Sequence, residues 1–193
     1  MRNTIDSRIY PMKGTSYSLG GEVGLPGGSL KYYKTTVGAT RYFPFGKDQT
    51  LMVMGSAGVA NGYSGRPLPF TKNFYAGGIG SVRAYDSYSL GPVDPTTGGR
   101  LGGTKELVGS AEYLFPMPGM GKDKSVRLGA FLDGGQVWGA STAIKLNDLR
   151  YSAGLSANWN SPFGPLKFSF GQPLNKKEGD KVQRLQFTMG TAF

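Results

Sequence analysis

Few residue types in this chain could carry out covalent chemistry. Its 193 residues include no Cys and no His. The lack of cysteine removes disulfides, thiolate metal sites and cysteine nucleophiles. The lack of histidine removes the commonest general base and the commonest metal ligand. We therefore predict no catalytic residue, no metal site and no cofactor, and we expect that the protein is not an enzyme.

The charge of the chain does not point to nucleic acid. Lys and Arg number 22 against 12 Asp and Glu, a formal net charge of +10. These basic residues are scattered among turns and polar strand faces, without interleaved aromatic residues. The cluster Gly77-Gly78-Ile79-Gly80 resembles a phosphate cradle, but no helix follows it. Solvated hairpin ends, or contact with anionic lipid headgroups, explain the charge more simply.

Apolar and polar residues alternate along several segments. In residues 149–160 the odd positions include Leu155 and Trp159, whereas the even positions include Ser152 and Ser156. A period of two predicts a β-strand with one apolar and one polar face. The same alternation occurs in three further segments, residues 107–115, 126–133 and 185–193.

The composition of the two faces indicates a membrane protein. The polar faces consist largely of Ser, Gly, Asn and Thr, and aromatic residues, 12% of the chain, gather near the ends of the expected strands. An outer-membrane barrel has an apolar face toward lipid, a polar interior and aromatic girdles at both interfaces. We predict an all-β fold, an antiparallel transmembrane β-barrel in the bacterial outer membrane; a soluble barrel or sandwich is the alternative.

Turns rich in Gly and Pro divide the chain into eight expected strands within one domain, residues 1–193. Because four of the turns are short, the strands should form an antiparallel meander. Residues 1–13 should hold the end of a preceding strand and a turn. The expected strands cover residues 14–25, 29–43, 50–62, 105–116, 124–138, 147–160, 165–174 and 181–193.

One strand has a competing interpretation. Asp133-Gly134-Gly135 is a good two-residue hairpin signal and could end the fifth strand early. The remainder, residues 136–139, would be too short to return across a membrane. We favour a continuous strand, in which the glycines permit close approach of another part of the chain.

A long loop of about residues 63–104 separates the third and fourth strands. Loops longer than ~15 residues are usually functional or disordered. This one contains many apolar residues, including Phe74, Ile79, Val82 and Leu90, so we expect it to pack against something.

Within this loop, Asn73 to Tyr85 and the following Leu90-Gly91-Pro92 closely resemble the sixth extracellular loop of the BamA family, whose members assemble outer-membrane proteins. The family motif is Val-Arg-Gly-(Phe/Tyr), and this chain carries Val82-Arg83-Ala84-Tyr85. Ala84 departs from the family glycine, which matters if the position needs a positive φ. The resemblance extends over nearly the whole chain.

The resemblance implies that the chain corresponds to one part of a larger barrel. Members of this family have a sixteen-strand barrel, preceded by periplasmic POTRA domains. These eight strands correspond to the C-terminal half of that barrel, so the first half and the POTRA domains are absent here. No apolar run follows Met1, and we therefore expect no signal peptide.

The resemblance also implies a partner set for Arg83. In the family the loop folds into the lumen and its arginine contacts acidic groups on the inner wall. The matching residues here are Asp133 and Glu112, both of which the alternation also points inward. Arg83 would then latch the loop to the wall with a bidentate contact. The alternative is that Arg83 is a solvated loop charge and Asp133 a turn residue.

The number of strands constrains this latch. An eight-strand barrel is just wide enough for its own side chains, so if these strands close on themselves the loop must lie outside or cap the mouth, and Arg83 loses Asp133. If two copies join edge to edge as a homodimer, the wide lumen and the contact survive. One of these outcomes is required, because unpaired edges do not persist in lipid.

The last strand resembles the targeting signal that assembly machinery reads by strand addition, with outward residues Leu185, Phe187, Met189 and Phe193. In the family this strand pairs weakly with the first strand, and the seam opens so that client outer-membrane proteins can grow on it. We therefore expect an assembly and insertion factor acting by strand templating and lateral opening.

Other partners and functions follow from the same resemblance. The partners are the lipid bilayer or detergent and client proteins, while accessory lipoproteins would bind only through the missing POTRA region. The chain alone should accordingly be inactive. The main alternative is passive transport or secretion through a related barrel of the two-partner secretion type. An outer-membrane enzyme on a small barrel is a third alternative, disfavoured by the lack of histidine.

Overall fold

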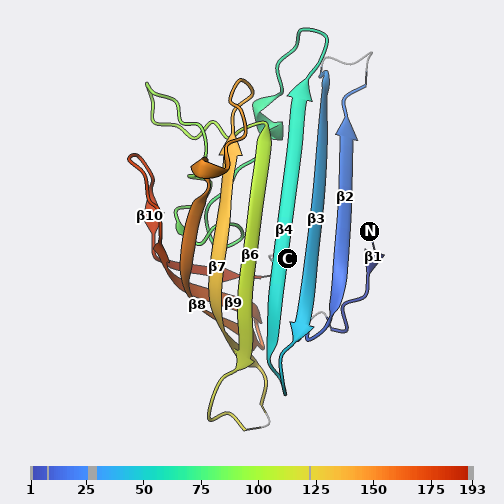
Figure 1. Cartoon of the computed structure of the whole chain (residues 1–193), viewed down its shortest axis with the longest axis vertical. Coiled ribbons are helices and arrows are strands. Elements are labelled where there is room, and N and C mark those ends of the chain that lie inside the picture. Colours follow the sequence, from blue (N-terminus) through green and yellow to red (C-terminus); the bar gives the residue numbers. More distant parts are fainter. Residues whose placement is uncertain (1, 8, 26–29, 122, 191–193) are drawn as a thin grey trace.

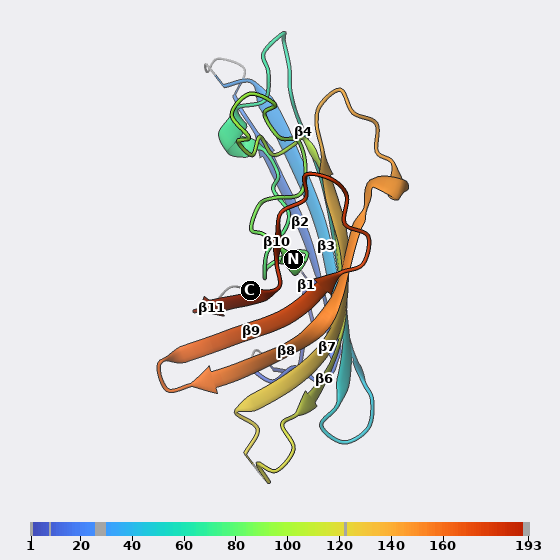
Figure 2. The same ribbon diagram turned by 90° about the vertical axis from the view of Figure 1, so that its left-hand side faces the viewer.

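The chain forms a curved antiparallel sheet with a long loop on its concave side (Figures 1 and 2). This computed structural model describes residues 2–7, 9–25, 30–121 and 123–190. Within these ranges the large sheet has nine strands. In sheet order they are β1 (Arg2–Asn3), β2 (Gly14–Val23), β3 (Tyr32–Pro44), β4 (Thr50–Gly62), β6 (Lys105–Pro116), β7 (Val126–Trp138), β8 (Arg150–Ser161), β9 (Gly164–Pro173) and β11 (Leu185–Met189).

The remaining elements are small. Strands β5 (Ala84–Tyr85) and β10 (Val182–Gln183) pair with each other in a separate two-stranded sheet. Two 3₁₀ turns, η1 (Phe70–Lys72) and η2 (Leu146–Asp148), lie in loops. No helix in the described ranges is long and apolar enough to cross a membrane.

The fold class predicted from the sequence is confirmed. Every long strand pairs antiparallel with the strand before it and the strand after it in the sheet, as in a meander. Strands β4 and β6 begin and end at the predicted residues. Strand β7 runs without a break through Asp133-Gly134-Gly135, so the alternative hairpin at these residues is wrong.

The last predicted strand needs a correction. It was expected over residues 181–193, but β11 covers only Leu185–Met189 within the described ranges. The two residues of β10 pair with β5 in the long loop and not with β9. The reason is that the loop reaches this part of the chain on the concave side and offers its own backbone partners. Phe193 lies outside the described residues.

Side chains alternate between the two faces as the sequence pattern predicts. In β8, Leu155 is 63% exposed and Ser156 is 5% exposed. In β9, Phe170 is 61% exposed and its neighbour Ser169 is 2% exposed. The convex face is therefore apolar, and the concave face carries the polar side chains. This is the arrangement of a barrel wall with lipid outside.

The sheet is open. Strands β1 and β11 form its two edges, and neither pairs with the other in the described part of the chain. Figure 2 shows that β8, β9 and β11 swing across from the line of β2 and β3, so the sheet curves as part of a wider wall. The long loop occupies the hollow that this curvature creates.

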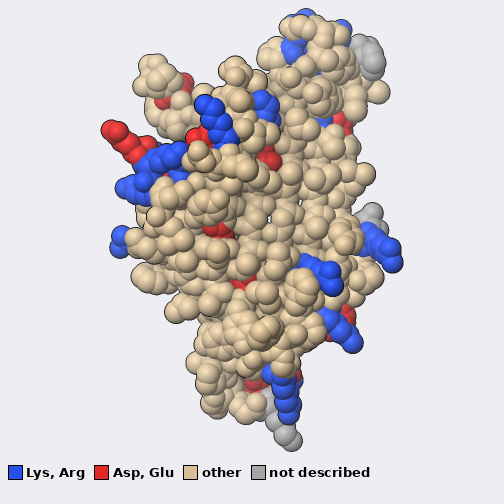
Figure 3. All heavy atoms as spheres, viewed as in Figure 1, with Lys and Arg blue, Asp and Glu red and all other residues tan. Residues whose placement is uncertain are grey.

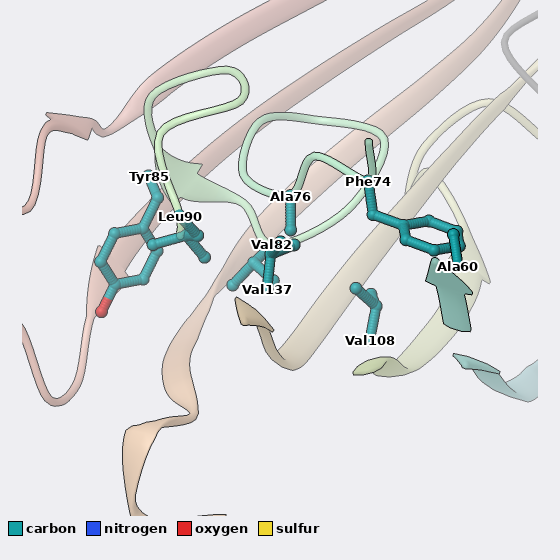
Figure 4. Close-up of a cluster of buried hydrophobic side chains, with 8 residues drawn as sticks. All are labelled: Ala60, Phe74, Ala76, Val82, Tyr85, Leu90, Val108 and Val137. Carbon is teal, nitrogen blue, oxygen red and sulfur yellow. The ribbon is translucent and has the colours of Figure 1, made fainter. Parts of the chain in front are cut away.

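The hydrophobic core lies between the long loop and the concave face. Five loop residues pack against three strand residues of β4, β6 and β7 (Figure 4). The loop ring of Phe74 sits over Gly58, where an added Cβ would lie 2.5 Å from the ring. The loop is thus a packed part of the structure. The cluster consists of Ala60, Phe74, Ala76, Val82, Tyr85, Leu90, Val108 and Val137.

Candidate functional site: a buried arginine on the inner wall

Two strands form an acidic patch on the concave face. Strand β6 supplies Ser110 and Glu112, and β7 supplies Phe131 and Asp133. In the register of the two strands, Ser110 lies opposite Asp133 and Glu112 lies opposite Phe131. Residues two apart on a strand point to the same face, so the four side chains make a two-by-two patch with its carboxylates on one diagonal.

Arg83 of the long loop binds both carboxylates. Its Nε and Nη2 donate to the two oxygens of Asp133, each at 2.7 Å, which is a bidentate contact. Its Nη1 donates to Glu112 Oε2 at 2.9 Å, and Nη2 also donates to Ser110 Oγ at 3.1 Å. Charge-assisted contacts of this kind are stronger than neutral hydrogen bonds and fix orientation as well as distance.

The surroundings complete the arginine site. The Arg83 guanidinium lies over the Phe131 ring, 3.6 Å from its centroid. The backbone N–H of Arg83 donates to Asp133 Oδ2 at 3.0 Å, and Ser156 of β8 donates its hydroxyl to Glu112. Arg83 is 3% exposed, Glu112 2% and Asp133 1%. Removal of one partner would therefore leave an uncompensated buried charge, which typically costs about 3–5 kcal/mol.

The net charge of the cluster is close to balanced. One guanidinium faces two carboxylates, and Lys167 of β9 interacts through its charge with both Glu112 and Asp133. Burial by itself would lower the pKa of Arg83, but the hydrogen bonds that Arg83 donates to Asp133 and the charges of Glu112 and Asp133 raise it above its ordinary value. The two carboxylates therefore favour the charged form of Arg83.

The rest of the motif fits the wall closely. At Gly135 an added Cβ would lie 2.8 Å from Val82 Cγ2, so the wall needs a glycine where the loop tip meets it. Ala84 has a φ of 69°, in the left-handed region that favours glycine. Ala84 therefore holds the conformation that a glycine would adopt, at a steric cost of roughly 1–2 kcal/mol.

Tyr85 is fully buried beside the last two strands of the wall. Its hydroxyl donates to the Tyr151 carbonyl at 3.3 Å. Burial raises the pKa of Tyr85 to about 12, and the negative charge of Asp180 adds to the shift. The Tyr85 carbonyl accepts a hydrogen bond of 2.7 Å from Gln186 Nε2 of β11.

A second set of contacts, which the sequence did not indicate, ties the loop motif to the chain before β11. Ala84 and Tyr85 pair with Gln183 and Val182, and the next backbone N–H, of Asp86, donates to the Lys181 carbonyl at 2.9 Å. Nearby, Arg150 of β8 binds Asp180 through two hydrogen bonds, of 2.5 and 3.1 Å. The one available signal was the polar Gln186 at an inward position of the last strand.

The residues of the last strand lie apart from this cluster. Leu185, Phe187 and Met189 are 65%, 55% and 67% exposed on the convex face. The Phe187 ring packs on Phe168 of β9, with centroids 4.8 Å apart. These side chains face the surroundings of the sheet and do not contact Arg83.

The contacts of the site bind and position one segment of the chain. Among the described residues there is no group of acidic side chains that could hold a metal ion. The side chains of Arg83, Ser110, Glu112 and Asp133 hydrogen-bond to one another. Arg83 therefore holds the long loop against the wall, together with the apolar contacts of the loop.

The fold and the site define a class of protein: a transmembrane β-barrel of the outer-membrane type, of which this chain forms an open part of the wall. The family model described as the Omp85 superfamily domain matches residues 1–193. The chain therefore belongs to the Omp85 superfamily.

Individual relatives agree with this assignment. Over the whole chain it is 43% identical to the outer membrane protein assembly factor BamA of Neisseria meningitidis and 33% identical to that of Nitratidesulfovibrio vulgaris, covering 28% and 24% of those proteins. The sorting and assembly machinery component 50 homolog B of Xenopus laevis is 27% identical over 98% of the chain and 44% of that protein.

A solved structure shows the same wall. The crystal structure of BamA from Haemophilus ducreyi lacking POTRA domains 1–3 superposes with a TM-score of 0.84 at 29% identity, over 96% of this chain and 40% of that one. The chain spans about a quarter of the length of the BamA relatives, and it is similar to part of their barrel. The resemblance stated from the sequence is confirmed.

Proposed function

We propose that this chain is the C-terminal part of the barrel of an outer-membrane protein assembly factor, located in the outer membrane of a Gram-negative bacterium. The observation that carries the proposal is the 43% identity, over the whole chain, to a protein named for that activity. The noncovalent architecture supports it, since the arginine cluster holds a loop and leaves no group free to react. We accordingly propose a binding protein and not an enzyme.

Strand templating would use the free edge of β11. On one side this strand pairs with β9 from Leu185 to Met189, and its other side has no partner in the described part of the chain. A row of unpaired N–H and C=O groups is a template for a further strand. A client strand could therefore add there by main-chain hydrogen bonds, as outward Leu185, Phe187 and Met189 face lipid.

The long loop, which we equate with the sixth loop of the family, would control the position of that edge. Arg83 fixes the loop to β6 and β7, and the same motif then binds β10 through backbone pairing and β11 through Gln186. The wall, the loop tip and the last strand form one connected unit. Release of Arg83 would free the last strand to move, which is what lateral opening requires.

Further partners would bind parts of the longer relatives that this chain does not cover. Accessory lipoproteins would bind the POTRA region of the whole protein, which this chain does not include. The chain alone should then fail to receive clients and show little or no assembly activity. In isolation its two open edges favour an edge-to-edge homodimer, because unpaired strands do not persist in lipid.

A chimera tests the proposal. In Neisseria meningitidis BamA the segment that matches this chain would be replaced by the chain, and the folding rate of a small client barrel measured in proteoliposomes. We expect the chimera to accelerate client folding and its Arg83→Ala variant to lose most of the acceleration. A folded chimera without acceleration would contradict the proposal, and channel current in its place would favour passive transport or secretion.

A further inference from the structure

An arginine lies on the lipid-facing side of the sheet. Arg41 of β3 is exposed, between the inward Thr40 and Tyr42, and its guanidinium lies 4.6 Å from the ring centroid of outward Phe43. Charged residues on the lipid face of a barrel cost ~2–4 kcal/mol at the midplane and less near the interfaces. An arginine in this position needs a polar partner or an anion.

The protein itself gives Arg41 no polar partner. Within the described ranges its guanidinium makes no ion pair and donates no hydrogen bond. The other outward cation of the long strands, Lys105, differs: its Nζ donates to the Ala140 and Thr142 carbonyls at 3.1 and 2.8 Å. Among the described residues, the N–H groups of the Arg41 guanidinium therefore have no acceptor, whereas the Lys105 ammonium has two.

A second arginine lies nearby on the same face. Arg2 pairs with Tyr17 of β2, and Arg41 pairs with Thr15 of the same strand, so Arg2 and Arg41 flank β2 from either side. From the spacing of strands and the rise per residue, their Cα atoms are about 12 Å apart. Two extended arginine side chains span such a distance, so both guanidinium groups can reach one anion above Thr15 and Tyr17.

The surface between them is hollowed. A groove of about 330 Å³ is lined by residues that include Thr15, Tyr17, Arg41 and Phe43, and an adjoining groove of about 240 Å³ is lined by Arg2, Thr4, Thr15 and Tyr17. Both share Thr15 and Tyr17. The residues that continue the first groove along the sheet, Ala39 and Val53, are apolar, which suits an acyl chain beside a polar headgroup.

The two grooves lie at the level of the membrane where lipid headgroups are expected. Arg41 lies three residues from the end of β3, on the side of the short β3–β4 turn, and short turns of outer-membrane barrels face the periplasm. Aromatic residues gather at this level, where Phe45 packs on Tyr113 and Tyr113 on Phe115. Figure 3 shows basic side chains on this face over the β1 to β3 side, among mostly uncharged atoms.

We propose that Arg2 and Arg41, with Thr15 and Tyr17, bind the phosphate of an anionic phospholipid headgroup in the periplasmic leaflet. The guanidinium groups would bind the phosphate oxygens bidentately, as arginine does with phosphates elsewhere. The proposal rests on the membrane position proposed above, but not on assembly activity. Its role would be to fix the height of this side of the wall in the membrane.

Lipid retention tests the proposal. The folded chain in a neutral detergent would be titrated with phosphatidylglycerol, and bound lipid counted by native mass spectrometry. We expect Arg2→Gln/Arg41→Gln to lower the affinity at least tenfold and Arg41→Lys to lower it less. Lys13→Gln/Lys47→Gln, exposed residues at the same end of the sheet, is the control of equal charge. Heat-modifiable gel mobility would establish that each variant is folded.

Three results would overturn the proposed lipid site. The first is equal phosphatidylglycerol affinity in the arginine variant and the lysine control, which would mean that the arginines only reach toward the aqueous interface. The second is equal affinity for phosphatidylcholine, which lacks the net negative charge. The third is binding of inorganic phosphate, without lipid, as tightly as phosphatidylglycerol. Each can occur whether or not the chimera assembles clients, so the two proposals fail separately.

Discussion

Arg83 is the residue through which the long loop is held to the wall. Its five hydrogen bonds, four from the side chain and one from the backbone, go to Ser110, Glu112 and Asp133, and all three partners are buried. Burial of these charges has a desolvation penalty, and loss of any one partner destabilises the fold because the remaining charges stay buried without compensation.

Asp133→Asn should lower the free energy of unfolding by about 3 kcal/mol, since it removes a charge without changing the volume and leaves Arg83 underpaired. Denaturant titration of the folded chain in detergent measures this. Glu178→Gln, an exposed turn residue, is the matched control and should change little. If the two variants unfold alike, Asp133 does not hold the loop.

Ala84→Gly should stabilise the protein by about 1 kcal/mol, because it relieves the left-handed conformation at φ 69°. The same titration measures the change, with Ala57→Gly in β4 as a control that should destabilise. A lower unfolding midpoint for Ala84→Gly would show that contact of the Ala84 methyl group with the wall outweighs its backbone strain.

The Tyr85 hydroxyl should lose its proton at a higher pH than that of an exposed tyrosine. Burial raises its pKa to about 12, so the neutral hydroxyl is favoured in the folded state. Its contribution to stability is complete below the ordinary tyrosine pKa of about 10 and is lost as the pH rises through about 12. The difference in ultraviolet absorbance between the wild type and Tyr85→Phe should titrate near pH 12. A titration near pH 10 would place Tyr85 in water.

At the scale of elements, the strands were well predicted and the contacts of the loop were not. The ends of β4 and β6 and the unbroken β7 follow from alternation and turn residues, which are local. The pairing of β5 with β10 joins segments almost a hundred residues apart. No local pattern encodes such a pairing, because two-residue strands have neither a period nor a turn that sets their partner.

Gln186→Leu should loosen the last strand from the loop. It removes the hydrogen bond from Gln186 to the Tyr85 carbonyl, worth about 1 kcal/mol, and leaves that carbonyl with the hydrogen bond from the Gly78 backbone N–H at 3.0 Å. Amide hydrogen exchange should accelerate in residues 181–189 and stay unchanged in β3 and β4. Thr188→Val, inward on the same strand, is the control. Equal exchange in both variants would show that β11 does not depend on the loop.

At the scale of the whole molecule, the open sheet and its bound loop decide how the chain can close. The loop core and the arginine cluster fill the concave side, and an eight-strand barrel has no room for both. Closure of one chain on itself would therefore expel the loop. Joining of two chains would keep it.

The mass of the folded species in detergent distinguishes these outcomes. We expect two chains per particle, and protease resistance of the loop near Arg83, because the ring of two chains satisfies both edges and keeps the cluster buried. A stable particle of one chain with a cleavable loop would show instead that the strands close and the loop leaves the lumen.

The sequence by itself determined the fold class, the two faces of the sheet, the strand order and the inward direction of Glu112 and Asp133. These depend on alternation and turns, which act between near neighbours. The resemblance of the loop motif implied Asp133 and Glu112 as partners of Arg83. Only the tertiary structure decided the geometry of that contact, the left-handed conformation of Ala84, and the pairing of the loop with the chain before β11. Such contacts form only when the sheet curves and brings distant segments to one hollow.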